Sequence, residues 1–322
     1  MSLSKKLIML SKIKNIFHLL RVRQYYKNVL VFAGIFFSQR LFDTTLYFNL
    51  LIGFIILCCT SSINYIVNDI IDINKDRKHP EKMRKKPLAS GELSLFFAVF
   101  LLILFGGITI LLLVFILPNL GFVFMIVMLI LTGQLYNYLL KKYAFIDIII
   151  LSTGYLWRAL AGCAIIEEFV SAWLFLAIFE VALFLSIAKR RGDLILLGKD
   201  KAVEHKTVYD QYSLTLLNQF HLIIAGSLFM TYSLYLIIKF NLFESSIIPG
   251  SATLYEYFSI LTIPISLYII MRYMYLTSSK PEIARNTEKA FLDKGIIIAG
   301  FILLIVLFIA FYFEYILLIL GL

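Results

Sequence analysis

Residues 96–118 read FFAVFLLILFGGITILLLVFILP, an unbroken apolar run without one charged side chain. A run of this length reaches the roughly 20 residues that an α-helix needs to cross a bilayer. Apolar runs of the same kind cover residues 46–59, 122–132 and 296–322. These runs are continuous rather than alternating in polarity, which excludes a membrane β-barrel. The sequence therefore predicts an all-α, polytopic membrane protein.

The composition of the whole chain supports this class. Of the 322 residues, 61% are hydrophobic and 16% are charged, whereas a soluble domain carries about 25% charged residues. The three cysteines lie inside apolar runs, with no CxxC pattern and no Cys/His cluster. Neither a disulfide framework nor a zinc site is predicted.

The hydropathy pattern predicts nine membrane spans in one transmembrane domain over residues 1–322. Residues 1–16 mix basic and apolar side chains, as a helix lying in the membrane interface does. The predicted spans cover residues 17–38, 44–71, 93–117, 120–139, 146–165, 170–189, 214–239, 253–276 and 294–318.

The distribution of cations predicts the orientation. Of the 30 Lys and Arg residues, all but Arg40, Arg158 and Lys239 fall at one face of this topology. By the positive-inside rule that face is cytosolic, and we expect a bacterial or archaeal-type plasma membrane. Orientation accounts for the net charge of +10, so no nucleic-acid partner is predicted.

Residues 68–80, NDIIDINKDRKHP, gather three carboxylates at the cytosolic end of the second span. On a continuous helix Asp69, Asp72 and Asp76 project from one stripe, and Asn68 adds an amide. Hard oxygen ligands without His or Cys select Mg²⁺ or Mn²⁺ over zinc. Because Mg²⁺ binds through one or two carboxylates plus substrate phosphates, the motif predicts a metal-bound phosphorylated substrate.

The loop that follows supplies the opposite charge. Residues 79–91 read HPEKMRKKPLASG, and their cations can contact phosphate oxygens: Lys82, Arg84, Lys85 and Lys86. Metal and cations around one diphosphate stabilise a leaving pyrophosphate. The alternative, that Lys75, Arg77 and Lys78 merely neutralise the aspartates in a solvated charge mosaic, stays open here.

Polar residues near the first predicted span and within the fifth are further candidates. Gln24, Lys27 and Asn28 share one helix face and could contact a phosphate or sugar, although Lys27 could also simply snorkel to the interface. Arg158 lies within an apolar stretch, where arginine is costly unless it is paired or lines a wet cavity.

Two alternatives concern charged side chains of the later spans. Arg158 could form a structural pair with Asp147 or Glu180. Lys189, Arg190 and Asp193 end the sixth predicted span, where they could bind substrate or form ion pairs along the helix surface.

The aspartate motif with its basic loop resembles the first aspartate-rich motif of the UbiA superfamily of intramembrane prenyltransferases. Residues 21–29, RVRQYYKNV, resemble a segment of its polyprenyl-phosphate (decaprenyl-phosphate) phosphoribosyltransferase branch. Residues 79–91 also resemble that branch, with Lys86 where Arg is usual. Further similarity covers residues 138–141, 154–162, 188–194 and 280–282.

This resemblance implies a UbiA-like helical bundle with a polar cavity facing the cytosol. It implies Mg²⁺-dependent transfer of 5-phosphoribose from phosphoribosyl pyrophosphate to a polyprenyl phosphate, with release of pyrophosphate. Asp69, Asp72 and Asp76, with Asn68, would be the catalytic metal ligands. The substrate-binding residues would be Arg23, Gln24, Lys27, Asn28, Lys82, Arg84, Lys142, Arg158, Lys189, Arg190 and Asp193.

Two other functions are weighed against this one. A prenyltransferase could use the same metal to ionise an isoprenyl diphosphate and alkylate an aromatic or quinone-precursor acceptor. The second acidic motif common in such enzymes is thin here, with Asp193 followed only by Asp200 and Glu204. A transporter or binding protein with a cation site is disfavoured, because no pair of Gly/Pro-broken helices lies at the membrane midplane.

Overall fold

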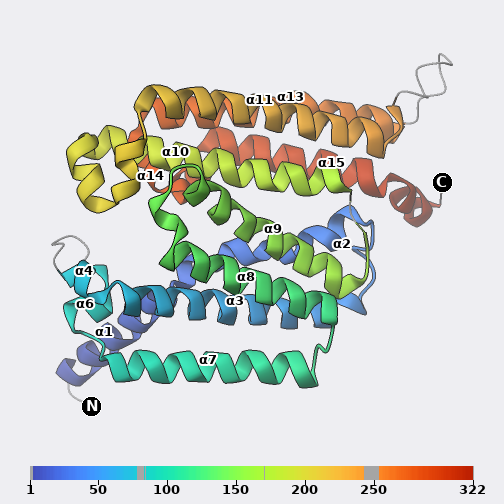
Figure 1. The fold of residues 1–322 in the computed structure, drawn as a ribbon. Helices are drawn as coiled ribbons and strands as arrows, with labels where there is room; N and C mark the ends of the chain where they lie inside the picture. The colour runs from blue at the N-terminus through green and yellow to red at the C-terminus, as the bar shows by residue number, and fades with distance from the viewer. Residues whose placement is uncertain (1–2, 78–82, 84, 170, 243–253, 322) are drawn as a thin grey trace. The chain divides into compact units, whose positions relative to one another are not determined.

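The computed structural model describes residues 3–77, 83, 85–169, 171–242 and 254–321. The chain forms two compact units (Figure 1). The first comprises Met1–Leu139 and Trp157–Phe169, and the second comprises Leu140–Leu156 and Val170–Leu322. Helix α9 (Ile146–Ile166) contributes residues to both units.

Within the described ranges, eight helices are long and apolar enough to cross a membrane. The all-α, polytopic prediction is confirmed, and the helix ends agree closely with predicted spans two to nine. The main extension is α10, which continues past residue 189 across a kink at Gly198. The eight are α3 (Leu46–Ile71), α7 (Leu95–Phe115), α8 (Leu120–Tyr138), α9, α10 (Ala172–His205), α11 (Leu214–Lys239), α13 (Leu254–Ser279) and α15 (Lys294–Leu320).

The first predicted span, residues 17–38, is not one α-helix. It is divided among the end of α1 (Leu3–Leu20), the 3₁₀-helix η1 (Val22–Phe32) and α2 (Ala33–Phe37). Arg21 separates α1 from η1, because its backbone is left-handed with a φ of 51°. A 3₁₀ run of 11 residues is unusually long, and such stretches often mark functional segments. The polar residues at 21–28 are the reason, because they bond to α3, as described below.

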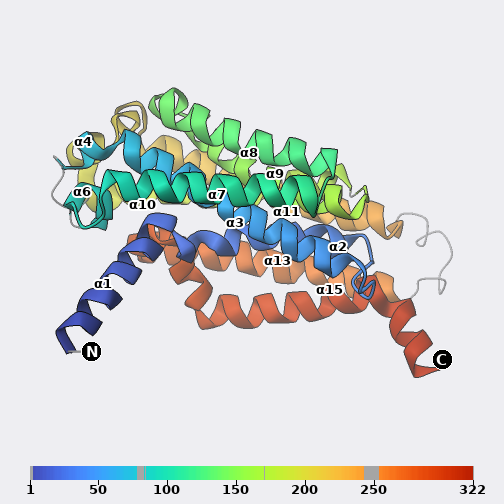
Figure 2. The ribbon, with the colours of Figure 1, turned by 90° about the horizontal axis from the view of Figure 1, so that it is seen from below.

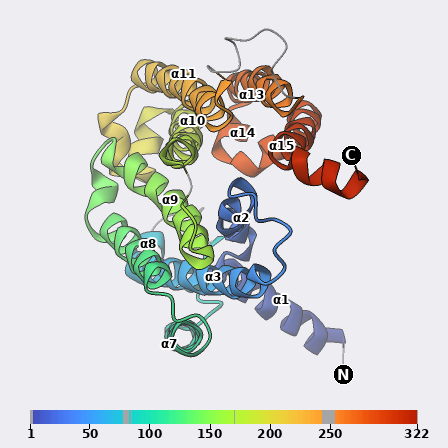
Figure 3. The same cartoon turned by 90° about the vertical axis from the view of Figure 1, so that its right-hand side faces the viewer.

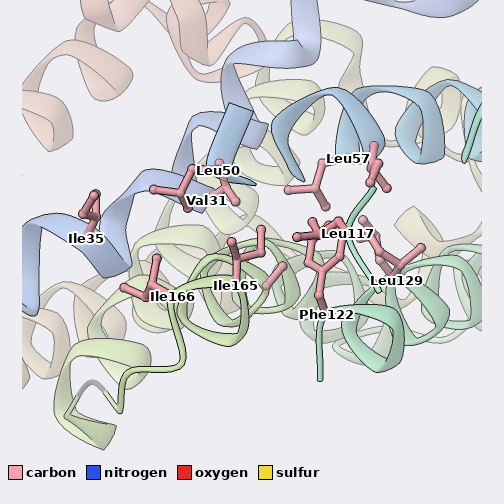
Figure 4. Packing of buried hydrophobic residues seen from close by; sticks show 12 residues of the cluster. Val31, Ile35, Leu50, Leu57, Leu117, Phe122, Leu129, Ile165 and Ile166 are labelled. Atoms are coloured by element: carbon pink, nitrogen blue, oxygen red, sulfur yellow. The ribbon is translucent and has the colours of Figure 1, made fainter. Parts of the chain in front are cut away.

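Helix α3 is the centre of the first unit. It packs against α7, α8, η1 and α1, and α7, α3 and α8 run side by side (Figure 1). The buried side chains that join these helices to the end of α9 include Val31, Leu57, Phe122 and Ile165 (Figure 4). Between membrane helices, close van der Waals packing rather than exclusion of water supplies this stabilisation.

Gly162 permits the closest approach in this core. A Cβ at this position would lie 1.9 Å from the Val31 carbonyl oxygen. We predict that Gly162→Ala lowers the free energy of unfolding by about 1–3 kcal/mol, the usual cost of overpacking. Thermal unfolding in detergent measures this loss. Gly106→Ala is the control, because its Cβ meets nothing within 4 Å; equal melting temperatures of the two variants would contradict the prediction.

The polar loop after α3 is built from two short helices. These are α4 (Ile73–Arg77) and α6 (Pro87–Ser90), which pack against each other, with α6 also touching α1. Both lie at the end of α3 that carries Asp69 (Figure 2). The chain thus brings Lys86, the residue before Pro87, back to the aspartate motif.

The second unit is built on two packed helix pairs. Helix α10 packs against α11, α13 packs against α15, and the short helix α14 (Pro281–Arg285) lies against α10 (Figure 3). Gly192 permits this last contact, since a Cβ there would come within 2.8 Å of the Ala284 Cβ and the Pro281 carbonyl oxygen. The small residue brings α14 beside the charged residues 189–193 in the middle of α10.

Candidate functional site

The aspartate motif lies where α3 ends. Asp72 is the C-cap residue of α3, and the backbone N–H of Asp76 donates to the Asp72 carbonyl oxygen over 2.8 Å. The three aspartates are therefore distributed over a helix end, a cap and α4 rather than along one continuous helix. Asp69 and Asp76 are nevertheless buried, with 4% and 2% of their surface exposed.

Lys86 joins the two buried carboxylates. Its Nζ lies 2.9 Å from Asp69 Oδ1 and 2.6 Å from Asp76 Oδ2. Lys86 has an extended backbone, as expected for a residue before proline, and Pro87 starts α6 behind it. Arg21 Nη2 donates to the same Asp69 oxygen over 3.1 Å. Carboxylates from α3 and α4 thus converge on one cation.

Arg21 is not among the predicted site residues, and Lys86 is predicted only as a possible contact to phosphate oxygens, not as a partner of the aspartates. Arg21 begins the segment that resembles the phosphoribosyltransferase branch, and Lys86 ends the basic run of the loop. Two buried carboxylates require cationic partners, and this requirement is the signal that points to them. Sequence spacing alone cannot show which of the many nearby cations reach the aspartates.

A row of polar contacts joins residues 21–28 to α3. As the residue number rises from 21 to 28, the number of its partner on α3 falls from 69 to 58, so the two segments run antiparallel. The arginine of the outermost pair also lies over the Tyr65 ring, 4.5 Å from its centroid. The pairs are Arg21 with Asp69, Gln24 with Tyr65 at 2.8 Å, Tyr25 with Ser62 at 2.7 Å and Asn28 with Cys58 at 3.2 Å.

This row places three of the predicted substrate-binding residues. Gln24 Oε1 accepts from Tyr65 Oη and from Lys27 Nζ, the latter over 3.3 Å. Asn28 is fully buried, and Arg23 is exposed. Gln24, Lys27 and Asn28 therefore follow the polar edge of α3 from the aspartate motif toward the membrane interior.

Arg158 marks the deep end of the row. Its Nε donates to Asn28 Oδ1 over 2.7 Å, and its Nη2 donates to Ser61 Oγ over 3.2 Å. The two acids proposed as structural partners for it have other contacts: Asp147 pairs with Arg190, and Glu180 accepts a hydrogen bond from Ser227. Arg158, which lies on α9, thus joins the row of polar contacts between η1 and α3.

A second polar cluster lies in the second unit, around residues 190–193 in the middle of α10. Arg190 donates through Nε and Nη2 to Asp147 Oδ2, at 3.0 and 2.7 Å. Tyr212 donates to the other oxygen of Asp147 over 2.7 Å. Arg190 and Asp147 are almost wholly buried, at 3% and 0% exposed. The predicted helix-surface pairing of Arg190 is replaced by a buried pair with α9.

Asp193 completes this cluster. It accepts from Tyr209 Oη and pairs with Arg285 Nε over 3.1 Å. Burial raises the pKa of both Tyr209 and Tyr212 above the ordinary tyrosine value, so both hydroxyls remain protonated donors at neutral pH. Of the other predicted residues here, Lys142 and Lys189 are exposed.

The first cluster fits a divalent cation in its donor chemistry. Its oxygens from Asp69 and Asp76 already bond one cationic nitrogen, and Mg²⁺ is bound through one or two carboxylates plus substrate phosphates. Across the described ranges there is no ready group of three or more His, Cys, Asp or Glu side chains that could hold a metal. Predicted residues Lys82 and Arg84 lie outside the described residues.

The chain is similar in sequence to two bacterial proteins of the same name. Decaprenyl-phosphate phosphoribosyltransferase from Mycobacterium tuberculosis is 29% identical over 221 residues, covering 67% of this chain and 72% of that protein. The protein of the same name from Corynebacterium glutamicum is 28% identical over 218 residues, covering 67% and 65%.

Solved structures show the same fold. A UbiA homologue from Archaeoglobus fulgidus, bound to DMAPP and Mg²⁺, has a TM-score of 0.65 at 18% identity, covering 92% of this chain and 97% of that chain. A digeranylgeranylglyceryl phosphate synthase has a TM-score of 0.55 at 18% identity, covering 94% and 99%. The sequence profile of the UbiA prenyltransferase family matches residues 28–294. The chain is a multi-pass membrane protein that belongs to the UbiA prenyltransferase family.

Proposed function

We propose that this protein transfers 5-phosphoribose from phosphoribosyl pyrophosphate to a polyprenyl phosphate, in a reaction that depends on Mg²⁺ or Mn²⁺. The observation that carries the proposal is the convergence of buried Asp69 and Asp76 on a single cation. It is supported by similarity over two thirds of the chain to proteins named decaprenyl-phosphate phosphoribosyltransferase. The site would face the cytosol of a bacterial or archaeal-type plasma membrane.

The donor diphosphate is assigned to the aspartate motif. Asp69 and Asp76, with Asp72 and Asn68, would hold the metal, which supplies charge neutralisation for the departing pyrophosphate. Arg21 adds a fixed positive charge at Asp69. Lys82 and Arg84 remain predicted contacts to the phosphate oxygens.

The reaction needs little proton transfer. An oxygen of the polyprenyl phosphate attacks C1 of the ribose, while the bond from C1 to the pyrophosphate oxygen breaks and its electron pair leaves with pyrophosphate. A phosphate nucleophile is already ionised at neutral pH, so no strong general base is required. By analogy with glycosyl transfer, the transition state has oxocarbenium character.

The polar row on α3 is assigned to the sugar and the acceptor phosphate. Gln24 and Asn28 offer amide groups, and Lys27 and Arg158 offer positive charge. The hydrogen bonds that Arg158 donates to Asn28 Oδ1 and Ser61 Oγ orient its guanidinium. Arg23, Lys142 and Lys189 are exposed and remain predicted substrate contacts, as do Arg190 and Asp193 within their buried cluster.

The second candidate function is prenyl transfer from an isoprenyl diphosphate. It is favoured by the solved UbiA homologue that binds DMAPP and Mg²⁺. The same metal site would serve both reactions, because both donors present a diphosphate. The acceptor therefore has to be determined by experiment.

An assay with purified protein separates the two functions. Given Mg²⁺, labelled phosphoribosyl pyrophosphate and a polyprenyl phosphate, we expect a lipid-linked pentose phosphate to form. Chelation with EDTA should abolish the product, and added Mg²⁺ or Mn²⁺ should restore it. If no such product forms, while an isoprenyl diphosphate and an aromatic acceptor react, the phosphoribosyl proposal is wrong.

A further inference from the structure

Lys86 occupies the bonding position that a divalent cation would need. Its ammonium group bonds one oxygen of Asp69 and one of Asp76. The side chains of these aspartates are 4% and 3% exposed, whereas that of Lys86 is 21% exposed. The lysine is thus the more accessible partner, and it is the one that can move without exposing the buried carboxylates.

The surroundings explain why an internal cation is present. Two carboxylates that are held close together and away from water repel each other unless positive charge lies between them. Arg21 bonds Asp69, whereas Lys86 bonds both aspartates. Loss of Lys86 would remove the ammonium that lies 2.6 Å from Asp76 Oδ2 and 2.9 Å from Asp69 Oδ1.

We propose that Lys86 is an internal counter-ion that a divalent metal displaces from Asp69 and Asp76, and that this exchange makes metal and diphosphate bind together. The inference rests on the metal role in the proposed function. A metal that arrives alone has to break two charge-assisted hydrogen bonds of Lys86 and leaves its ammonium without those partners. When a diphosphate arrives with the metal, the displaced ammonium regains an anionic partner on a phosphate oxygen.

This exchange predicts a measurable coupling. Two ligands that each favour the same rearrangement strengthen each other's binding reciprocally, commonly by about 5-fold to 150-fold. In the unaltered protein, Mn²⁺ alone should bind weakly, and inorganic pyrophosphate should tighten Mn²⁺ binding by about tenfold or more. The lysine would thereby favour loading of the complete metal–diphosphate donor over loading of a bare metal.

The test uses the full chain in detergent with Mn²⁺ and inorganic pyrophosphate as probes. Equilibrium dialysis gives Mn²⁺ affinity with and without pyrophosphate, after correction for the complex that the two form in solution. In Lys86→Met, Mn²⁺ alone should bind about tenfold tighter, the size expected when a competing charge-assisted hydrogen bond is removed. The enhancement by pyrophosphate should be smaller than in the unaltered protein, because only direct coordination of the metal by phosphate still contributes to it. Lys86→Arg keeps the charge and should retain the enhancement.

Lys75→Met is the matched control. Lys75 is exposed on α4, one residue from Asp76, so its loss removes the same charge nearby without removing the bridge. The inference is overturned if Lys86→Met binds Mn²⁺ no more tightly than Lys75→Met, or if it keeps the full enhancement. Circular dichroism and gel filtration confirm that each variant is folded before binding is measured.

The two proposals fail in different ways. If the unaltered protein binds Mn²⁺, Asp69→Asn loses this binding and Lys86→Met behaves as the control does, the metal site stands and the counter-ion inference falls. If neither the unaltered protein nor Lys86→Met binds Mn²⁺ with pyrophosphate present, the metal role itself is wrong and the inference falls with it.

Discussion

Replacing Asp69 by asparagine should reduce the rate of product formation by about a thousandfold or more at saturating Mg²⁺. A catalytic metal contributes several kcal/mol of charge stabilisation in the transition state, and each 1.36 kcal/mol corresponds to a factor of ten in rate. Asp69 is bonded by two cations, since Arg21 and Lys86 both contact its Oδ1. The amide keeps the shape of the side chain and removes its charge.

The measurement is the initial rate with either candidate donor, compared between the variant and the unaltered protein. Glu92→Gln is the control, because Glu92 is an exposed acid just beyond α6 and the change removes the same charge. It should leave the rate unchanged. Full activity in Asp69→Asn with both donors would rule out the metal role of the motif.

The second large effect concerns stability. Arg190→Met should lower the free energy of unfolding by about 3–5 kcal/mol, the range for removing one partner of a buried ion pair. The reason is that Asp147, which is fully buried, loses two hydrogen bonds from the guanidinium and retains the bond from Tyr212. Thermal or denaturant unfolding in detergent measures the loss.

Lys189→Met is the control for this experiment. It removes the same charge from the neighbouring, exposed position and should change stability by no more than about 0.5 kcal/mol, as surface substitutions usually do. The double variant Arg190→Met with Asp147→Leu should recover part of the loss, because it leaves no buried charge behind. Equal stability of Arg190→Met and Lys189→Met would show that the pair contributes little.

Helix positions could be read from the sequence because membrane helices depend on a local property. A span requires enough consecutive apolar residues to match the bilayer, and residues 96–118 satisfy this requirement without reference to any other part of the chain. The predicted span at 214–239 and helix α11 have the same ends. The first predicted span differs, since Gln24, Tyr25 and Asn28 bond to α3 and hold this segment as a 3₁₀-helix.

The sequence predicted many residues of the candidate site but not how its charges pair. The sequence by itself determined an all-α membrane protein and a carboxylate motif suited to metal and diphosphate, because hydropathy and ligand type are properties of neighbouring residues. Only the tertiary structure decided which cations compensate the carboxylates: Lys86 for Asp69 and Asp76, and Arg190 for Asp147. Such pairing depends on distances of a few ångströms between segments far apart in the chain, and those distances are set by how the helices pack.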